Sequence, residues 1–185
     1  MCIGICAYAT CGIFAGTHAE VDKKRWKPLR TEIDILLLRN QPHHVIEGTG
    51  AAGMLLGETE VELRKRYGGP AYRDHAAPET LYYTDEKFNA AFVLRNGRIV
   101  EIHLEIEKNK PASLEWFTAL GLYESELRKL TPGDAASYLQ RFYRTKRLRQ
   151  VGDSVEVFSR GIRFRFRGKS VIFVDVMAPE PYNGE

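Results

Sequence analysis

Three ionisable residues occupy alternate positions along one stretch of the chain: Glu101, His103 and Glu105. Because successive side chains of a strand point to opposite faces, the three would share one face and could ligate a metal ion there. A charged, solvated strand face has the same spelling, and no other cluster of ligand residues stands nearby in the sequence. We expect no bound metal, and we keep a metal-binding protein or an uncharacterised enzyme as an alternative.

The glycines at positions 48, 50 and 53 spell G-x-G-x-x-G, the dinucleotide-binding fingerprint. That fingerprint needs a buried strand before it and a helix that begins within the glycines, so that the helix amides can hold a pyrophosphate. Only His44-Val45-Ile46 precedes it, and the next helix start is at Thr59. The interpretation we favour is a flexible lead-in to the first module, with no bound nucleotide.

No nucleophile with a partner base can be named from the sequence. The three cysteines, Cys2, Cys6 and Cys11, have neither the even number of a disulfide framework nor the C-x2-C spacing of structural zinc sites. The G-x-S-x-G elbow of serine hydrolases is absent. We therefore predict that the protein is not an enzyme and has no catalytic residues and no cofactor.

Positive charge is concentrated in one part of the chain. Residues 141–170 contain ten Lys or Arg and two acidic residues, whereas the net charge of the whole chain is only +3. Such a run is most often a solvated face. Basic residues interleaved with aromatic residues also suit an acidic partner or single-stranded nucleic acid, so a nucleic-acid-binding protein acting through residues 141–169 is an alternative.

The elements that must position these residues occur twice, at a constant offset of 76 residues. The matched pairs are Gly57 with Gly133, Glu58 with Asp134, Leu63 with Leu139, and Tyr67 with Tyr143. Each part continues into two alternating segments around a turn, Asn96-Gly97 or Gly168-Lys169. We predict an α+β fold of two tandem helix-plus-antiparallel-sheet modules that form one compact unit. An apolar segment and charged lead-in cover residues 1–45, the first module 46–110, and the second 111–180.

Local signals mark where these elements begin and end. Thr59 and Glu62 have the spacing of a capping box, and Gly68-Gly69-Pro70 would end that helix. In the second copy we expect Asp134 to be the cap. A short helix is expected near residues 123–130. The apolar run at 33–38 suits a strand, although its periodicity also allows a helical turn.

Alternation assigns the two faces of the strands. In the first module we expect Val100, Ile102, Leu104 and Ile106 to point inward and Glu101, His103 and Glu105 outward. In the second, Ile162, Phe164 and Phe166 would point inward. Arg163, Arg165 and Arg167 would then form an outward row with about 6.8 Å between neighbours. We expect these three arginines, with Glu101, His103 and Glu105, to bind a partner, and expect their replacement by Gln to leave folding intact.

The stretch LLGETEVELRKRYGGP resembles the pattern L-G-x-[ST]-x-x-[EQ]-[VL]-x4-G-x-P. That pattern characterises a repeat family that includes the small lipoprotein of the outer-membrane barrel-assembly machinery and β-lactamase inhibitory protein, in which it occurs in tandem. The residues that carry the match are Leu56, Gly57, Thr59, Glu62, Leu63, Gly68 and Pro70. The second copy keeps Gly133, Asp134 and Leu139 but has Arg144 in place of the helix-ending glycine. The resemblance implies a bacterial protein that binds other proteins without catalysis.

These observations predict a non-enzymatic protein-binding module of the inhibitor, immunity or accessory type. It would use its exposed sheet face to bind a protein with an acidic patch. No apolar run approaches the roughly 20 residues of a membrane-spanning helix, so we expect a soluble protein without a membrane partner. Residues 2–16 are apolar, but the first basic residue is Lys23, so we expect a cytoplasmic location and leave export open.

Overall fold

The computed structural model describes residues 32–84, 88–106 and 116–180. They belong to one compact unit that runs over residues 28–180. The three cysteines and the apolar segment 2–16 lie outside the described residues.

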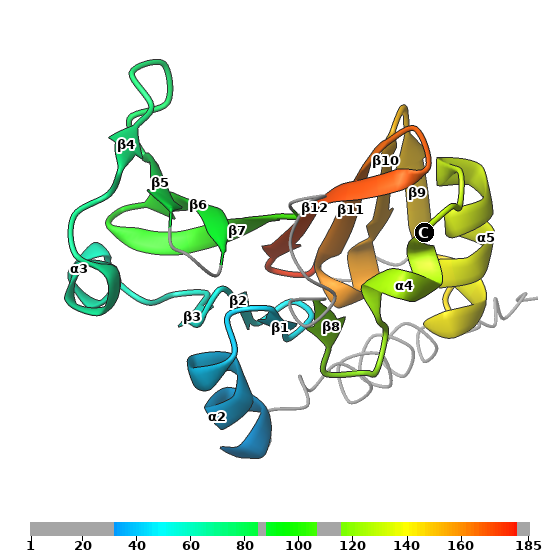
Figure 1. Ribbon diagram of the computed structural model, residues 1–185, viewed down its shortest axis with the longest axis horizontal. Coiled ribbons are helices and arrows are strands. Elements are labelled where there is room, and N and C mark those ends of the chain that lie inside the picture. Colours follow the sequence, from blue (N-terminus) through cyan, green and yellow to red (C-terminus); the bar gives the residue numbers. More distant parts are fainter. Residues whose placement is uncertain (1–31, 85–87, 107–115, 181–185) are drawn as a thin grey trace, which may run out of the picture. The chain divides into compact units, whose positions relative to one another are not determined.

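An eight-stranded sheet is the largest feature of this unit (Figure 1), and its strand order is β4-β5-β6-β7-β12-β11-β10-β9. The strands are β4 (Tyr72–Arg73), β5 (Thr80–Thr84), β6 (Asn89–Arg95), β7 (Arg98–Glu105), β9 (Leu148–Val151), β10 (Ser154–Val157), β11 (Ile162–Arg167) and β12 (Ser170–Met177). All neighbouring pairs in this sheet are antiparallel. Each half is a four-stranded meander, and the halves join where β7 pairs with β12. The predicted α+β class with an antiparallel sheet is confirmed.

A helix precedes each meander and begins at a capping box. At the start of α3 (Glu60–Tyr67), the Glu62 amide donates to the Thr59 hydroxyl (3.2 Å) and the Thr59 amide donates to the Glu62 carboxylate (2.7 Å), as predicted. Helix α5 (Pro132–Phe142) is capped by Thr131, and Asp134 is the capping-box partner. The prediction that Asp134 is the cap is therefore wrong. Pro132 gives the reason, because proline is favoured at the first helical position, where its missing N–H costs no hydrogen bond.

The two helices differ in length by about one turn. Because α5 starts at Pro132, it begins about one turn earlier than the offset of 76 predicts from α3. The offset of 76 does relate the buried leucines of the two helices, Leu63 and Leu139. A common module for the two halves therefore stays a prediction.

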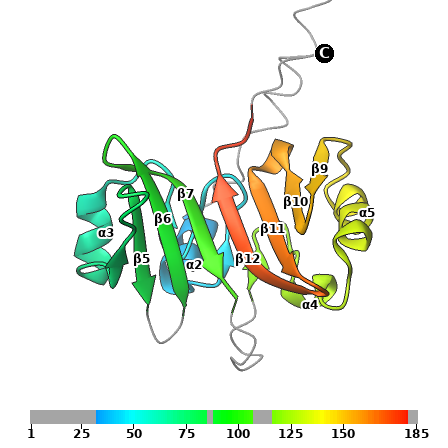
Figure 2. The ribbon, with the colours of Figure 1, turned by 90° about the horizontal axis from the view of Figure 1, so that it is seen from above.

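A second layer packs under the sheet, and Figure 2 shows it behind the strands. It contains α2 (Glu32–Asn40), β1 (His44–Val45), β2 (Gly50–Ala51), β3 (Met54–Leu55), β8 (Phe117–Thr118) and α4 (Glu124–Leu127). The strand expected at 33–38 is a helix, with Glu32 in its first turn and Arg39 in its last, where both complement the helix dipole. Helix α4 lies where a short helix was expected.

The glycine-rich motif lies in residues 44–55, which we call the lead-in segment. It begins where the charged lead-in of residues 1–45 was expected to end. Its glycines form turns and the β2–β3 hairpin, and α3 begins only at Glu60. Ala51, Ala52 and Met54 are each no more than 1% exposed. A side chain at Gly50 would overlap the carbonyl oxygen of Met54, so close packing requires glycine there. The expectation of a flexible lead-in is therefore wrong, because these residues belong to the core.

The core fills the space between the sheet and this second layer. Ile162, Phe164 and Phe166 are at most 3% exposed, as alternation predicts. Val100 is only half-buried and Ile99 takes a core position instead. The cause is an irregularity in the pairing of β6 with β7 between Val93 and Leu94, which changes the alternation at that point. None of the described helices is long and apolar enough to cross a membrane.

We predict that Thr59→Ala lowers the free energy of unfolding by about 1 kcal/mol, because the Glu62 amide loses its capping acceptor. Chemical denaturation followed by circular dichroism measures the change. Thr84→Ala, at the exposed end of β5, is the control and should stay within about 0.5 kcal/mol of the parent. Equal effects of the two substitutions would show that the cap contributes nothing.

Candidate functional site

One face of the sheet has no described helix over it, and this face is in front in Figure 2. The register places one residue from each of the eight strands in a line across it, which we call the cross-strand row. In the order of the strands it consists of Tyr72, Tyr82, Ala91, His103, Asp175, Arg163, Glu156 and Arg149. These residues share a face because directly paired residues of neighbouring strands point to the same side.

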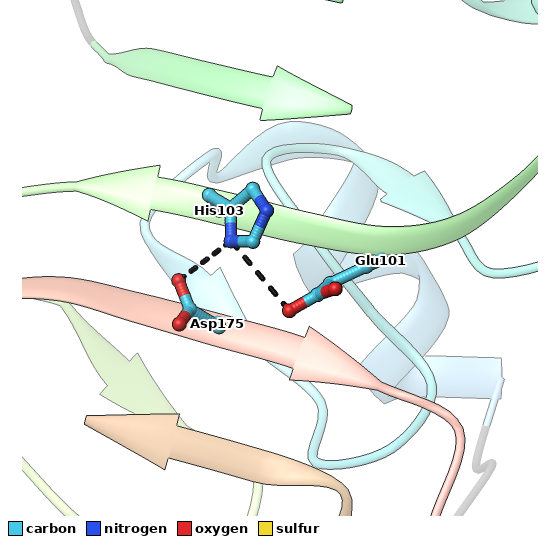
Figure 3. A group of neighbouring side chains, drawn as sticks. All are labelled: Glu101, His103 and Asp175. Atoms are coloured by element: carbon cyan, nitrogen blue, oxygen red, sulfur yellow. Dashed lines mark hydrogen bonds and ion pairs between the residues drawn. The ribbon is translucent and has the colours of Figure 1, made fainter. Parts of the chain in front are cut away.

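Asp175, on β12, is the centre of the row and is fully buried. Its Oδ1 lies 2.8 Å from His103 Nδ1, and because a carboxylate only accepts, Nδ1 carries the hydrogen (Figure 3). Arg163 Nε donates to Oδ2 (2.7 Å) and Arg165 Nη2 donates to Oδ1 (2.8 Å). Three side chains, one from β7 and two from β11, therefore bind the Asp175 carboxylate of β12, which lies between these two strands.

Glu101 completes what we call the charge cluster: Glu101, His103, Arg163, Arg165 and Asp175. Arg163 Nη2 donates to Glu101 Oε1 at 2.6 Å, and His103 Nδ1 lies 3.7 Å from the same oxygen. Two carboxylates thus face two guanidiniums, and the formal charges of these four groups cancel. Such charge-assisted bonds are stronger than bonds between neutral groups.

The pKa values in the cluster follow from this arrangement. Burial has the largest influence on Asp175 and by itself would raise its pKa. The hydrogen bond and charge of His103 and the charges of Arg163 and Arg165 outweigh burial, so the pKa of Asp175 lies below its usual range. Burial likewise opposes the charge of Arg163, but Asp175 and Glu101 outweigh it and raise the pKa of Arg163. Both groups are therefore ionised at neutral pH.

The structure changes the sequence interpretation of the six predicted binding residues. Arg163 and Arg165 do point to the helix-free face, but they bind Asp175 there. Of the three arginines only Arg167, at the end of β11, is exposed, and it makes no ion pair with a described residue. Glu105 is exposed and accepts a hydrogen bond from Asn89 (3.3 Å) instead of joining the cluster. The three arginines point outward as expected, but two of them are already paired with Asp175. Their joint replacement by Gln would leave Asp175 without two of its donors, so the expectation that folding stays intact is wrong.

Asp175 is the residue that the sequence analysis missed. It lies far from His103 in sequence, and only the pairing of β12 with β7 brings the two together. One local signal was available: Asp175 is a single acid in the otherwise apolar stretch VIFVDVM. A charged residue in the middle of such a strand requires a partner.

The ligand set for a metal also differs from the expected one. Glu101, His103 and Asp175 have donor atoms within 4.8 Å of one another, whereas Glu105 is not part of this group. The nearest oxygens of both acids already accept hydrogen bonds from guanidiniums. A divalent cation would have to displace these bonds and lie beside two positive charges. The geometry therefore fits an internally neutralised network better than a metal site.

The His103–Asp175 pair also resembles the orienting half of a hydrolase triad. The residues paired directly with His103 are Ala91 and Asp175. Among the described residues, no hydroxyl or thiol is hydrogen-bonded to its ring. The cluster therefore supplies no nucleophile that His103 could activate.

In the basic segment 141–169, the aromatic side chains of strand β11 are not available for stacking with bases. Phe164 and Phe166 are buried, so the aromatic residues between the arginines face the core and not a ligand. Bases that bind without pairing need exposed aromatic rings. The alternation in this segment is the pattern of a two-faced strand, which weighs against the nucleic-acid alternative.

The ends of the row are more exposed than its centre. Tyr72 and Tyr82 are 49% and 37% exposed, and their ring centroids lie 5.5 Å apart. His75 lies against Tyr72 at 6.1 Å. At the other end, Arg149 donates to Glu156 (3.2 Å) and its side chain remains 57% exposed.

Two depressions of about 330 Å³ and 270 Å³ occur in the first half. Each contains a salt bridge, Arg73–Glu60 (2.9 Å) in the larger and Arg39–Glu58 in the smaller. None of the residues that line them belongs to the cross-strand row. They are therefore separate from the candidate site.

Comparison with known proteins found similar solved structures, and two of them are as follows. A DUF4309 family protein (YjgB) from Bacillus subtilis has a TM-score of 0.47 and 16% identity, over 78% of this chain and 95% of that chain. A cysteine-rich secretory protein (SAV1118) from Staphylococcus aureus has a TM-score of 0.32 and 13% identity, over 66% of this chain and 43% of that chain. No family model and no curated protein matches the sequence.

We predict that Asp175→Asn lowers the free energy of unfolding by about 3 kcal/mol, because removing one member of a buried charge network leaves the others unpaired. Arg167→Gln, which changes an exposed arginine of β11, is the control and should cost no more than about 0.5 kcal/mol. Urea denaturation at pH 7 measures both. A cost for Asp175→Asn as small as that of the control would contradict the role given to Asp175.

The same pair of proteins tests the pH dependence. Because the pKa of Asp175 is lowered on folding, its stabilisation is present above the ordinary pKa of about 3.9 and is lost as pH falls through the folded value. The stability difference between the parent and Asp175→Asn should thus be present at pH 5 and shrink below about pH 4. A difference that keeps its size down to pH 2 would show that the charge of Asp175 is not its source.

Proposed function

We propose that this chain is a non-enzymatic protein-binding module of the inhibitor, immunity or accessory type. Its binding surface is the helix-free face of the eight-stranded sheet, along the cross-strand row. The observation that carries this proposal is a charge cluster whose two carboxylates are paired within the protein, flanked by exposed tyrosines on one side and exposed arginines on the other.

The charge cluster lowers the cost of covering this face. A partner that buries unpaired charges must compensate their lost hydration, which often cancels the gain from new contacts. Here the carboxylates of Asp175 and Glu101 already accept guanidinium donors. A partner can therefore exclude water from the centre without supplying a counter-charge for every group.

The ends of the row supply the residue types that dominate binding energy. Tyr and Arg are enriched among the residues whose truncation weakens protein complexes most. The row crosses eight strands, which at about 4.8 Å between neighbours spans roughly 34 Å. A surface of that width suits a standard interface of about 800 Å² per partner.

The partner's chemistry follows from what remains exposed. Arg149 and Arg167 lie on the β9–β11 side, so the partner presents carboxylates there. Opposite Tyr72 and Tyr82 it presents an apolar group. As the sequence predicts, the partner presents an acidic patch. In the structure this patch would face Arg149 and Arg167, because Arg163 and Arg165 are paired with Asp175.

We also propose that the two halves are tandem copies of one module, as the L-G-x-[ST] resemblance implies. In support, each half is a helix with a Thr-x-x-acid capping box followed by a four-stranded meander. The second capping box lies one helical turn earlier than the sequence offset implies. A longer helix in one copy accounts for that difference.

The exposed tyrosines provide the test. We predict that the double variant Tyr72→Ser, Tyr82→Ser binds the natural partner at least about 30-fold more weakly, which corresponds to the 2 kcal/mol of a strong contact residue. The partner is captured from an extract of the source cells on the immobilised parent chain, purified, and its affinity for each variant is measured by calorimetry.

Tyr123→Ser is the matched control, because Tyr123 is also 49% exposed but stacks on Phe117, outside the row. It should bind like the parent, and circular dichroism checks that all variants are folded. Equal affinities of the double variant and the parent would refute the proposed face. Capture that nuclease abolishes and that weakens steeply with salt would instead support nucleic-acid binding.

A further inference from the structure

A buried carboxyl group lies far from the charge cluster, in the lead-in segment. Glu47 lies two residues after the end of β1, next to Ile46, and is only 8% exposed. It meets parts of the chain that are distant in sequence: Thr118 of β8, Tyr143 at the end of α5, and Arg160 of the short 3-10 helix η2 (Phe158–Arg160). Thr118 and Tyr143 are themselves 2% and 5% exposed.

Hydrogen bonds join these groups around the carboxyl. Tyr143 Oη donates to Glu47 Oε1 at 3.1 Å. Thr118 is near enough to lower the pKa of both Glu47 and Tyr143. The Thr118 Oγ1 accepts from the Leu122 amide (3.1 Å), which leaves its single hydrogen free to point toward this group. Arg160 lies 5.9 Å from the Tyr143 ring and is the positive charge that acts on the group.

Burial is the strongest influence on Glu47, and it raises the pKa of this carboxyl in spite of the bonds from Thr118, its own backbone and Tyr143 and the charge of Arg160. The same burial raises the pKa of Tyr143 well above its usual value, so the phenol keeps its proton. Glu47 is therefore the member of the group whose charge changes as pH rises.

The lead-in segment is held at both ends by tyrosines. Tyr67, at the end of α3, donates to the carbonyl of Ala52 (2.8 Å), whereas Tyr143, at the end of α5, donates to the carboxyl of Glu47. The bond at Ala52 joins neutral groups, whereas the bond at Glu47 involves an ionisable one. Of these two tyrosine bonds, only the one to the second half therefore responds directly to a change of pH in the acid range. At the first half the Leu55 amide also donates to the Glu58 carboxylate (2.7 Å), which is paired with Arg39.

We propose that Glu47 is a proton-operated latch that fastens the lead-in segment to the second half of the fold. The latch is closed when the carboxyl carries a proton and is loosened when it ionises, because a buried carboxylate gains hydration by opening to water. The inference is independent of the proposed binding function.

The packing next to Glu47 indicates which part of the fold would move if the latch loosened. Gly48 follows Glu47, and its Cα is one of the atoms nearest to Gly161, where any side chain would also overlap the Met177 carbonyl. The Met177 amide donates to Gly161 (3.0 Å) at the end of β12. Movement of the lead-in segment away from this contact would free the end of the strand that carries Asp175.

The test is the pH dependence of local opening in the parent and in Glu47→Gln, which keeps the shape and the acceptor oxygen but does not ionise. A raised folded pKa gives stability that is complete below the ordinary Glu pKa of about 4.3 and is lost as pH rises through the folded value. Amide hydrogen exchange, corrected for the intrinsic effect of pH, is measured at Gly50 and Ala119, whose amides bond to Ile46 and Val45.

Protection of these two amides in the parent should fall by at least about tenfold between pH 4 and pH 8. In Glu47→Gln this fall should be absent. Buried His44, whose pKa is lowered by burial, would change protection only in the opposite direction, with a loss as pH falls. Glu126→Gln is the matched control, because Glu126 also accepts from a tyrosine, Tyr138, but at the surface. This control should behave like the parent.

A second variant keeps the proposal testable if Glu47→Gln does not fold. Tyr143→Phe removes one donor to the ionised carboxyl, so the loss of protection should move to higher pH. Equal pH dependence of the parent and Glu47→Gln, or an unchanged midpoint in Tyr143→Phe, would overturn the latch.

Discussion

A buried carboxylate stays ionised only if charged or hydrogen-bonding groups replace its hydration, and Asp175 meets this requirement at the centre of the sheet. Its partners come from β7 on one side and β11 on the other. Because side chains alternate, a slip of β12 by one residue would turn Asp175 into the apolar core and bring a valine to the polar face. The register in which the two halves join is thus the register in which Asp175 is satisfied.

This constraint determines the character of the helix-free face. Arginines and acids that would be separate charges on an isolated strand are neighbours once β7, β12 and β11 pair. Their mutual bonds hold the guanidiniums in fixed positions, and Arg165 lies over the Phe173 ring at 4.0 Å. Fixed side chains lose less conformational entropy when a partner covers them. A face of this kind is suited to protein binding because its centre is ordered before the partner arrives.

The opposite face depends on the lead-in segment. Its glycines allow the chain to turn tightly under β7 and β12, where bulkier residues would not fit. The tyrosines at the ends of α3 and α5 reach it from the two halves. A stretch with the spelling of a nucleotide-binding loop is therefore a packed layer under the sheet that contacts both halves, and Glu47 is the group that we propose links that packing to pH.

The sequence by itself determined the features that local chemistry controls. The Thr59–Glu62 capping box, the turns at Asn96-Gly97 and Gly168-Lys169, and the inward positions of Ile162, Phe164 and Phe166 were all predicted, because each depends on residues a few positions apart. Tertiary structure decided the rest. The partners of Arg163 and Arg165, the burial of Glu47 and the inward position of Ile99 depend on contacts or strand pairings outside the local pattern. A periodic pattern states which face a side chain occupies, but what it meets there is set by which distant strand becomes its neighbour.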